Sequence, residues 1–262
     1  MKKALFIINP IAGVKKKKNI PELIKKYLDK KIFDFEITFT KYAGHGNTLA
    51  QNATKVYDIV IAVGGDGTIN EIATGLRNSQ TSLGIIPMGS GNGLARHLNI
   101  PLNTIKAIQF LNLQKERKID TCTLNDKTFF CTAGVGFDGY IGDIFSKQTS
   151  RGFWTYFKCT IREFFNYQPK DYFFNDKQVK ATLITVANAN QFGNNVFISP
   201  FSNIEDGKFE VCVLKPFPKW SILGLSIQLF TKKINNSKYY NVSSHNEAVS
   251  YTHLTLPTTP YV

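Results

Sequence analysis

The chain has 262 residues, of which 43% are hydrophobic and 19% are charged, so it is globular, and extended disorder and collagen-like sequence are excluded. Lysine and arginine exceed aspartate and glutamate by 13. This excess favours an anionic partner, which is nucleic acid, a phosphorylated ligand or an acidic membrane surface.

The first half of the chain alternates β-rich apolar runs with amphipathic stretches, a rhythm typical of βαβ units and a mostly parallel, buried sheet. The runs predict strands over residues 4–8, 35–40, 58–63 and 83–87. The stretches between them predict helices over 20–30, 47–56 and 67–77, and short helices that begin at Ser90 and Thr104.

From about Arg117 the pattern changes to strand-like runs that are joined by turn residues. These runs are 118–125, 127–135, 170–175, 180–189 and 208–215, with turns at Asn125-Asp126 and Asp206-Gly207. They predict an antiparallel, β-sandwich-like domain. We expect an α/β domain over 1–115, a β-rich domain over 116–247 and a non-native tail over 248–262.

The segment Gly64-Gly65-Asp66-Gly67-Thr68-Ile69-Asn70-Glu71 directly follows a predicted buried strand and opens a predicted helix. Glycines let the backbone turn tightly and let its N–H groups approach a phosphate, and the helix N-terminus adds a partial positive charge. The segment therefore predicts an anion site, although a plain strand-to-helix turn capped by Asp66 is an alternative.

A second glycine-rich loop, Gly89-Ser90-Gly91-Asn92-Gly93, follows the next strand, and a turn at Asn9-Pro10-Ile11-Ala12-Gly13 ends the first strand. Ligands of open α/β sheets bind at the carboxyl ends of the strands, so we expect three turns to share one extended ligand. Neither glycine loop matches the P-loop pattern G-x-x-x-x-G-K-[ST].

The stretch 134–139 has the spacing G-x-G-x-x-G, but it lies in the β-rich half. A dinucleotide-binding fingerprint belongs at the start of a βαβ unit, so we do not expect one here.

Taken in order, these motifs resemble the diacylglycerol kinase catalytic family, which includes sphingosine and ceramide kinases. The likeness extends over residues 1 to about 215. It rests on Asn9-Pro10 with Gly13, Gly64-Gly65-Asp66-Gly67-Thr68 with Glu71, Gly89-Ser90-Gly91-Asn92 with Ala95-Arg96, Gly134-Val135-Gly136-Phe137-Asp138, and Asp206-Gly207.

The resemblance implies ATP-dependent phosphorylation of a hydroxyl of diacylglycerol or a related sphingoid or ceramide-like lipid, with Mg²⁺ as a cofactor. The domain over 1–115 would be the nucleotide-binding domain and that over 116–247 the lipid-substrate domain, with the nucleotide in a cleft between them. Matching family positions would hold it with Asn9, Pro10, Gly13, Thr40, Gly64, Gly65, Asp66, Gly67, Thr68, Asn70, Glu71, Gly89, Ser90, Gly91 and Asn92. Asp66, the candidate catalytic residue, would act on the triphosphate directly or through Mg²⁺.

A further Mg²⁺ position of some relatives corresponds here to Asn203, Asp206 and Lys208. An ordinary Asp-Gly turn is the alternative. Independently of any family, phosphoryl transfer needs exact positioning and cations that neutralise the negative charge, which the loops and Mg²⁺ with the lysines would supply.

The chain departs from the family near its end. Relatives carry a late Asp-Gly-Glu triplet whose Asp receives the proton of the lipid hydroxyl, whereas Asp206 is the last aspartate here. The stretch 248–262 has no charged side chain except histidine, and we expect native sequence to stop near Glu247. The absent base leaves the activity of this chain open.

Three observations bear on location and partners. The four cysteines form no C-x-x-C pair, which fits a reducing cytosol. The apolar runs 151–165 and 220–230 are too short to span a bilayer, so we expect peripheral, transient membrane contact at most. Because no nucleic-acid-binding motif accompanies the lysines, we expect no nucleic-acid partner.

Two alternatives to a lipid kinase remain. NAD kinases share the Gly-Gly-Asp-Gly-Thr loop, but they lack the second glycine loop and the early Asn-Pro turn of this chain. A nucleotide-binding module with impaired catalysis would explain the missing late aspartate.

Overall fold

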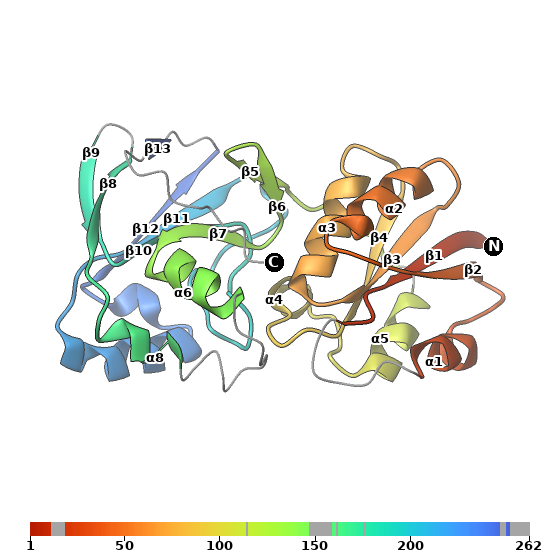
Figure 1. The fold of residues 1–262 in the computed structure, drawn as a ribbon, viewed down its shortest axis with the longest axis horizontal. Helices are drawn as coiled ribbons and strands as arrows, with labels where there is room; N and C mark the ends of the chain where they lie inside the picture. Colours follow the sequence, from red (N-terminus) through yellow and green to blue (C-terminus); the bar gives the residue numbers. More distant parts are fainter. Residues whose placement is uncertain are drawn as a thin grey trace. The chain divides into compact units, whose positions relative to one another are not determined.

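The computed structural model describes residues 1–11, 19–113, 115–146, 159–160, 162–174, 177–246 and 250–251. The chain divides into two compact units, Met1–Lys118 and Ile119–Tyr261 (Figure 1). We call them unit 1 and unit 2.

Unit 1 is built on a four-stranded sheet in the order β2-β1-β3-β4, in which all neighbours are parallel. Its strands are β1 (Lys2–Ile8), β2 (Phe33–Phe39), β3 (Ile59–Gly64) and β4 (Ser82–Pro87). The predicted parallel sheet is confirmed. The register sets Ile8 beside both Phe39 and Val63, so the carboxyl ends of the strands meet at one edge.

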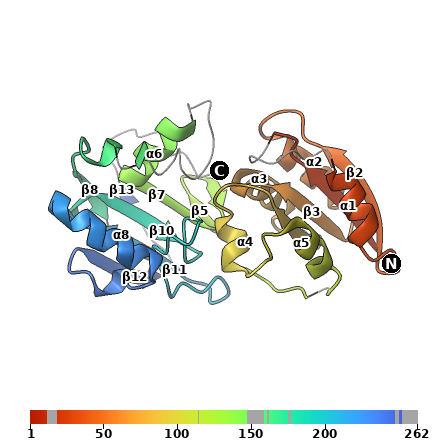
Figure 2. The same ribbon diagram turned by 90° about the horizontal axis from the view of Figure 1, so that it is seen from below.

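Within its described residues, unit 1 has five helices, with α2 and α3 on one face of the sheet and α1 and α5 on the other (Figures 1 and 2). They are α1 (Ile20–Tyr27), α2 (His45–Ala53), α3 (Asp66–Leu76), α4 (Gly93–His97) and α5 (Thr104–Leu111). Fully buried side chains of the strands and of α1 and α5, including Phe6, Ile24 and Ile108, form one core cluster. Their burial supplies the main stabilisation of unit 1.

Two helices begin two or more residues away from the position that the sequence predicts. The helix expected from Ser90 begins at Gly93, because Asn92 takes a left-handed conformation with φ 53° and ends the turn first. The helix expected over 47–56 spans His45–Ala53, since Gly44 at φ 85° already redirects the chain.

Unit 2 contains an antiparallel sheet in the order β12-β11-β10-β7, a second sheet in the order β13-β8-β9, and the hairpin β5-β6. The antiparallel prediction is confirmed. The strands are β5 (Cys122–Leu124), β6 (Lys127–Phe129), β7 (Thr132–Gly136), β8 (Lys170–Phe174), β9 (Lys177–Ala181), β10 (Leu183–Ala187), β11 (Phe209–Leu214), β12 (Tyr240–His245) and β13 (Ser250–Tyr251).

Two predicted runs of unit 2 each contain two strands. The run 127–135 divides into β6 and β7 at Phe130 and Cys131. There the Cys131 carbonyl accepts hydrogen bonds from the backbone amides of Asn188 and Ala189 and does not continue a strand ladder. The run 180–189 divides at Thr182, which joins β9 of one sheet to β10 of the other.

Helices α6 (Phe137–Ser146) and α8 (Ile222–Phe230) pack on the sheets of unit 2, and short 3-10 turns occupy Lys219–Ser221 and Ile234–Asn236. The G-x-G-x-x-G stretch joins β7 to α6, but β7 pairs antiparallel with β10 and no βαβ unit forms there. A Cβ on Gly136, which has φ 98°, would lie 2.6 Å from the Thr182 carbonyl oxygen. Glycine is therefore required by packing at this position.

Most of the amphipathic stretch 151–165 and of the tail 248–262 lies outside the described residues, as do Glu247 and Gly13. Within the stretch, the described Cys159 and Phe164 are buried in a cluster with Phe137 and Ile141. Among the helices that the structure describes, none has the length and apolar character that crossing a bilayer requires.

Candidate functional site

The turns that follow the parallel strands of unit 1 lie side by side because the strand ladder continues into them. The Asn9 amide donates to the Val63 carbonyl at 3.0 Å, and the Thr40 amide donates to the Ile8 carbonyl at 2.9 Å. The Met88 amide donates to the Gly64 carbonyl at 2.6 Å. Residues from all four strand ends, far apart in sequence, are thus assembled at one edge.

The two glycine loops touch through their backbones at Gly65 and Gly89. A Cβ built on Gly89 would lie 2.6 Å from the Cα of Gly65, and one built on Gly65 would lie 3.1 Å from the Cα of Gly89. Side chains at these positions would force the loops apart. Only glycine fits at positions 65 and 89, because the two backbones approach each other more closely than a Cβ atom allows.

Asp66 joins the first glycine loop to the second. Its carboxylate oxygens accept hydrogen bonds from the amides of Asn92 at 2.8 Å and Gly93 at 2.7 Å, at the start of α4. Burial raises the pKa of the Asp66 carboxyl above its ordinary value, while the backbone donors oppose that rise. Asp66 therefore positions the loops through both of its carboxylate oxygens.

Asn92 closes the second loop on itself. Its side-chain oxygen accepts from the Gly89 amide at 2.8 Å, and its side-chain nitrogen donates to the Gly89 carbonyl at 2.9 Å. The side chain is buried. This pair of bonds fixes the loop without any ligand, so the loop is preorganised.

The turn after β1 is tied to α3 by Asn9. The Asn9 side-chain nitrogen donates to the buried Thr68 hydroxyl at 2.9 Å, and its oxygen accepts from the Ile11 amide at 3.1 Å. A Cβ on Gly64 would lie 2.5 Å from the Thr68 Cβ, so Thr68 packs directly on the end of β3. Asn9, Gly64 and Thr68 form one packed group.

Glu71 holds a neighbouring helix. Its oxygens accept from the amides of Gly44 at 2.9 Å and Gly46 at 3.2 Å, at the start of α2, and the Asn47 side chain donates to the Glu71 carbonyl at 3.3 Å. The N-cap residue of α2, Gly44, has no side chain that could cap the helix. The Glu71 carboxylate binds the first amides of α2 in its place. Both acids of the first loop thus hold helix starts.

The remaining candidates of unit 1 lie at the same edge. Gly67 and Asn70 are in the first turns of α3, Ser90 is exposed at the tip of the second loop, and Gly91 accepts from the Arg96 side chain at 3.0 Å through its carbonyl. The exposed Pro10 follows Asn9. Within the described residues no side chain caps α3.

The three residues predicted for a further Mg²⁺ position lie on an exposed turn of unit 2. Asp206 accepts from the Lys208 amide at 3.0 Å, and Asn203 accepts from the Glu205 amide at 3.1 Å, both through side-chain oxygens. These bonds are those of ordinary Asx turns. Among the described residues no group of three or more histidine, cysteine, aspartate or glutamate side chains could hold a metal.

Sequence reasoning missed two residues that organise these turns. Asp120 accepts from the Gly207 amide at 2.7 Å, and its own amide donates to the Ile204 carbonyl at 2.7 Å, so it fixes the turn that carries Asp206. Gly44 is the other, because its amide meets Glu71. The signal for Gly44 was a glycine just before an amphipathic stretch; Asp120 offered none.

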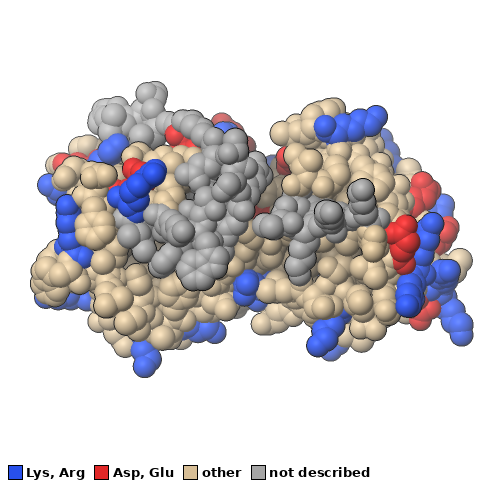
Figure 3. Space-filling model, turned by 60° about the horizontal axis from the view of Figure 1, so that its bottom comes forward, with Lys and Arg blue, Asp and Glu red and all other residues tan. Residues whose placement is uncertain are grey.

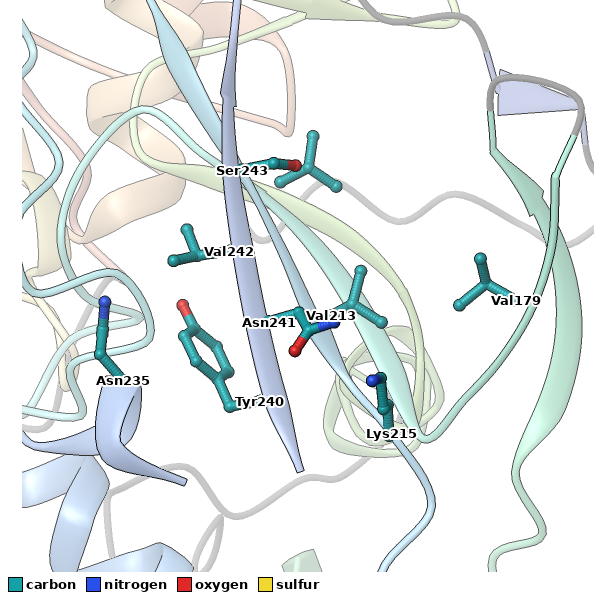
Figure 4. Close-up of a pocket in the computed structure, with 9 residues that line it drawn as sticks. Val179, Val213, Lys215, Asn235, Tyr240, Asn241, Val242 and Ser243 are labelled. Carbon is teal, nitrogen blue, oxygen red and sulfur yellow. The ribbon is translucent and has the colours of Figure 1, made fainter. Parts of the chain in front are cut away.

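Unit 2 also contains an open cavity of about 530 Å³ between its two sheets. Figure 4 shows Val213 and Lys215 facing Val179 across it, with Asn241 and Ser243 on the same side, whereas Tyr240 and Val242 project from the opposite face of β12. The cavity lies beside β12, which is exposed along most of its length. An apolar wall with a lysine and an amide at its mouth suits an amphiphilic molecule.

Comparison with known proteins identifies both units. The diacylglycerol kinase catalytic domain family matches residues 3–124, and the YegS C-terminal NAD kinase beta sandwich-like domain family matches residues 132–239. A solved structure of a diacylglycerol kinase from Bacillus anthracis str. Sterne superposes with a TM-score of 0.68 over 96% of this chain and 85% of that one, at 22% identity. This likeness concerns the fold.

The chain is also similar in sequence to curated proteins. The diacylglycerol kinase of Bacillus subtilis is 32% identical over 232 residues, which are 82% of this chain and 74% of the relative. A protein of Chromohalobacter salexigens named a probable lipid kinase YegS-like is 30% identical over 192 residues, which are 69% of this chain and 62% of that protein. The chain therefore belongs to the diacylglycerol kinase catalytic-domain family, a family of lipid kinases.

Proposed function

We propose that this chain transfers the terminal phosphoryl group of ATP to a hydroxyl of diacylglycerol or of a related sphingoid or ceramide-like lipid. The observation that carries the proposal is the backbone contact between Gly65 and Gly89 at the start of α3. Two glycine loops held against each other at a helix N-terminus form a cradle of backbone amides, and such cradles bind phosphate groups.

The residues at the carboxyl edge of the parallel sheet fit a nucleoside triphosphate. The start of α3 lacks a side-chain cap among the described residues, so its first amides are directed at any anion that binds. Gly64, Gly65 and Gly67 would hold the phosphates, with Gly89 and Ser90 on the adjoining loop. Asn9, Thr40 and Thr68 would shape the adjacent wall.

The residues also fit Mg²⁺ that arrives with the triphosphate. Mg²⁺ in nucleotide sites is usually held by one or two carboxylates together with phosphate oxygens. Asp66 supplies a carboxylate at this edge, where it already joins the two glycine loops. The bound cation would neutralise charge on the phosphates.

The cavity of unit 2 is our candidate for the apolar part of the acceptor lipid. Its volume of about 530 Å³ lies within the range of small-molecule sites, roughly 300–1,000 Å³. Val179, Val211 and Val213 supply apolar wall, and Lys215 supplies a positive charge at the rim.

A transfer assay tests the function. Radiolabelled ATP with Mg²⁺ is incubated with the chain and with diacylglycerol, ceramide, sphingosine or NAD as acceptor. We expect label in a lipid product and none in NAD. Label in NAD alone would contradict a lipid kinase. ATP binding without transfer to any lipid would contradict the proposed activity and would favour a nucleotide-binding module.

A further inference from the structure

Helix α8 and the turn before it expose a row of large apolar side chains. Trp220 is 80% exposed, Leu223 71%, Ile227 56% and Phe230 42%. Their spacing of three and four residues places them on one side of the helix. We call these four residues the α8 face.

The other side of the same helix is already packed. Leu225 is 5% exposed and lies in a core cluster with Leu183, Ile198 and Leu214, and Leu229 packs against that cluster. Helix α8 therefore carries two apolar sides, of which one lies in the core and the other in solvent. Core packing accounts for the first side and leaves the α8 face unexplained.

The segment that carries α8 has charge of one sign. The segment 211–246 contains no aspartate or glutamate. Apart from Lys215, which lines the cavity described above, its lysines are Lys219, Lys232, Lys233 and Lys238, and all of these are exposed. Figure 2 shows α8 at the outer surface of unit 2, and Figure 3 shows uncharged surface in that part of the molecule with lysine and arginine side chains along its lower margin.

This combination fits an anionic bilayer better than a protein. Protein interfaces are depleted in lysine, whereas helices that lie in the plane of a membrane pair an apolar side carrying tryptophan, phenylalanine or leucine with flanking lysines. Anionic headgroups attract such lysines, and tryptophan favours the membrane–water boundary. A helix of nine residues is far below the roughly 20 that a bilayer crossing needs, so it lies along the surface.

We propose that the α8 face docks unit 2 on the surface of an anionic phospholipid bilayer, with Trp220, Leu223, Ile227 and Phe230 entering the headgroup region and the lysines contacting the headgroups. The biological reason for this docking rests on the proposed function, since a lipid acceptor resides in a bilayer. The docking itself is independent of that function, because it needs neither ATP nor an acceptor lipid.

Vesicle sedimentation without ATP tests the docking. The parent chain is mixed with vesicles of phosphatidylcholine alone and with vesicles that also contain phosphatidylglycerol. We expect binding to the anionic vesicles that weakens as salt is raised, and at least about tenfold weaker binding to the neutral ones. Equal binding to both, or to neither, would overturn the proposal, and absence of binding would favour a protein partner.

Matched variants locate the contact. Leu223→Ser/Ile227→Ser removes half of the α8 face, and Val56→Ser/Leu113→Ser removes two side chains of unit 1 that are 55% and 57% exposed. We expect the first pair to weaken binding at least about tenfold and the second to leave it unchanged. Equal losses, or none from the first pair, would contradict the assignment. Thermal melting checks that both variants fold.

Trp220 provides a second readout that does not depend on a variant of the α8 face. The chain has two tryptophans, so Trp154→Phe leaves Trp220 as the sole one. We expect its emission to shift to the blue on anionic vesicles and to be quenched by lipids with brominated acyl chains. Unchanged emission would contradict docking. Phosphorylation of detergent-dispersed lipid tests the proposed function separately, so the failure of either proposal is distinguishable.

Discussion

The glycine loops of unit 1 and the edge of the large sheet in unit 2 are held in opposite ways. In unit 1, the side chains of Asp66 and Glu71 accept from backbone amides of other turns, and that of Asn92 bonds within its own loop, so the loop positions are fixed without a ligand. In unit 2, β12 has solvent on most of its length and borders an open cavity. A preorganised polar edge suits charge stabilisation, whereas an open cavity with an apolar wall suits a variable hydrocarbon partner.

The largest effect is expected where the polar edge loses a bond between its two loops. Asp66→Asn leaves a single side-chain oxygen to accept from the backbone amides of Asn92 and Gly93. The new side-chain NH₂ group then faces one of these two N–H donors. We expect about 1–3 kcal/mol less free energy of unfolding, together with weaker ATP binding. Urea unfolding and calorimetric titration measure both quantities.

The matched control for this change is Asp34→Asn, at an exposed aspartate of β2. We expect it to leave ATP affinity unchanged. Equal affinities of the parent and Asp66→Asn would mean that the contact between the loops does not depend on the carboxylate.

A smaller effect is expected from Glu71→Gln, because Glu71 holds α2 and lies behind the loop contact. One of the amides of Gly44 and Gly46 loses its acceptor, which resembles the loss of a helix cap and costs about 0.5–2 kcal/mol. ATP affinity should fall less than in Asp66→Asn. A larger loss of affinity than in Asp66→Asn would place Glu71 in direct contact with the nucleotide.

The pH dependence of stability tests the environment of Asp66. Burial raises the pKa of this carboxyl in the folded chain above its ordinary value of 3.8. The folded state therefore holds the proton more tightly, and the stability that Asp66 contributes is full below pH 3.8 and is lost as pH rises through the folded pKa. The free energy of unfolding of the parent minus that of Asp66→Asn should decrease across this acid range. An increase would show that the backbone donors outweigh burial.

The smallest effect is expected for the reactivity of a cysteine on β11, in the buried interior of the large sheet of unit 2. Burial raises the pKa of Cys212 on β11 to about 11, and its side chain is fully buried. We expect no alkylation of Cys212 by iodoacetamide at neutral pH in the folded chain and rapid alkylation in denaturant. Mass spectrometry of digested protein reads this out. Fast alkylation of the folded chain would show that the sheet opens beyond β12.

Much of the fold could be predicted because buried parallel strands are continuous apolar runs, as in β3, and because glycine and asparagine mark the turns. The turn at Asn125-Asp126, for example, has positive φ at both residues and joins β5 to β6. The motifs likewise indicated which turns would lie together at one edge of the parallel sheet.

The contacts within the site could not be predicted, because they depend on how distant segments pack. Glu71 and Gly44 are 27 positions apart, and nothing in their spacing indicates that α2 begins beside α3. The helix expected at Ser90 starts at Gly93 because Asn92 bonds back to Gly89, a local alternative that helical periodicity does not register. Asp66 suggested direct contact with phosphate, yet its oxygens meet backbone amides first.

The central claim is that the backbone contact of Gly65 with Gly89 forms the phosphate cradle. Calorimetric titration of Mg²⁺-ATP into the parent, Gly89→Ala and Gly139→Ala tests it most directly. A Cβ on Gly89 would lie 2.6 Å from Gly65, whereas one on Gly139 meets nothing closer than 3.6 Å. We predict at least about tenfold weaker binding for Gly89→Ala, or about 1.4 kcal/mol, and parental binding for Gly139→Ala. A folded Gly89→Ala chain that binds ATP as tightly as the parent would contradict the account.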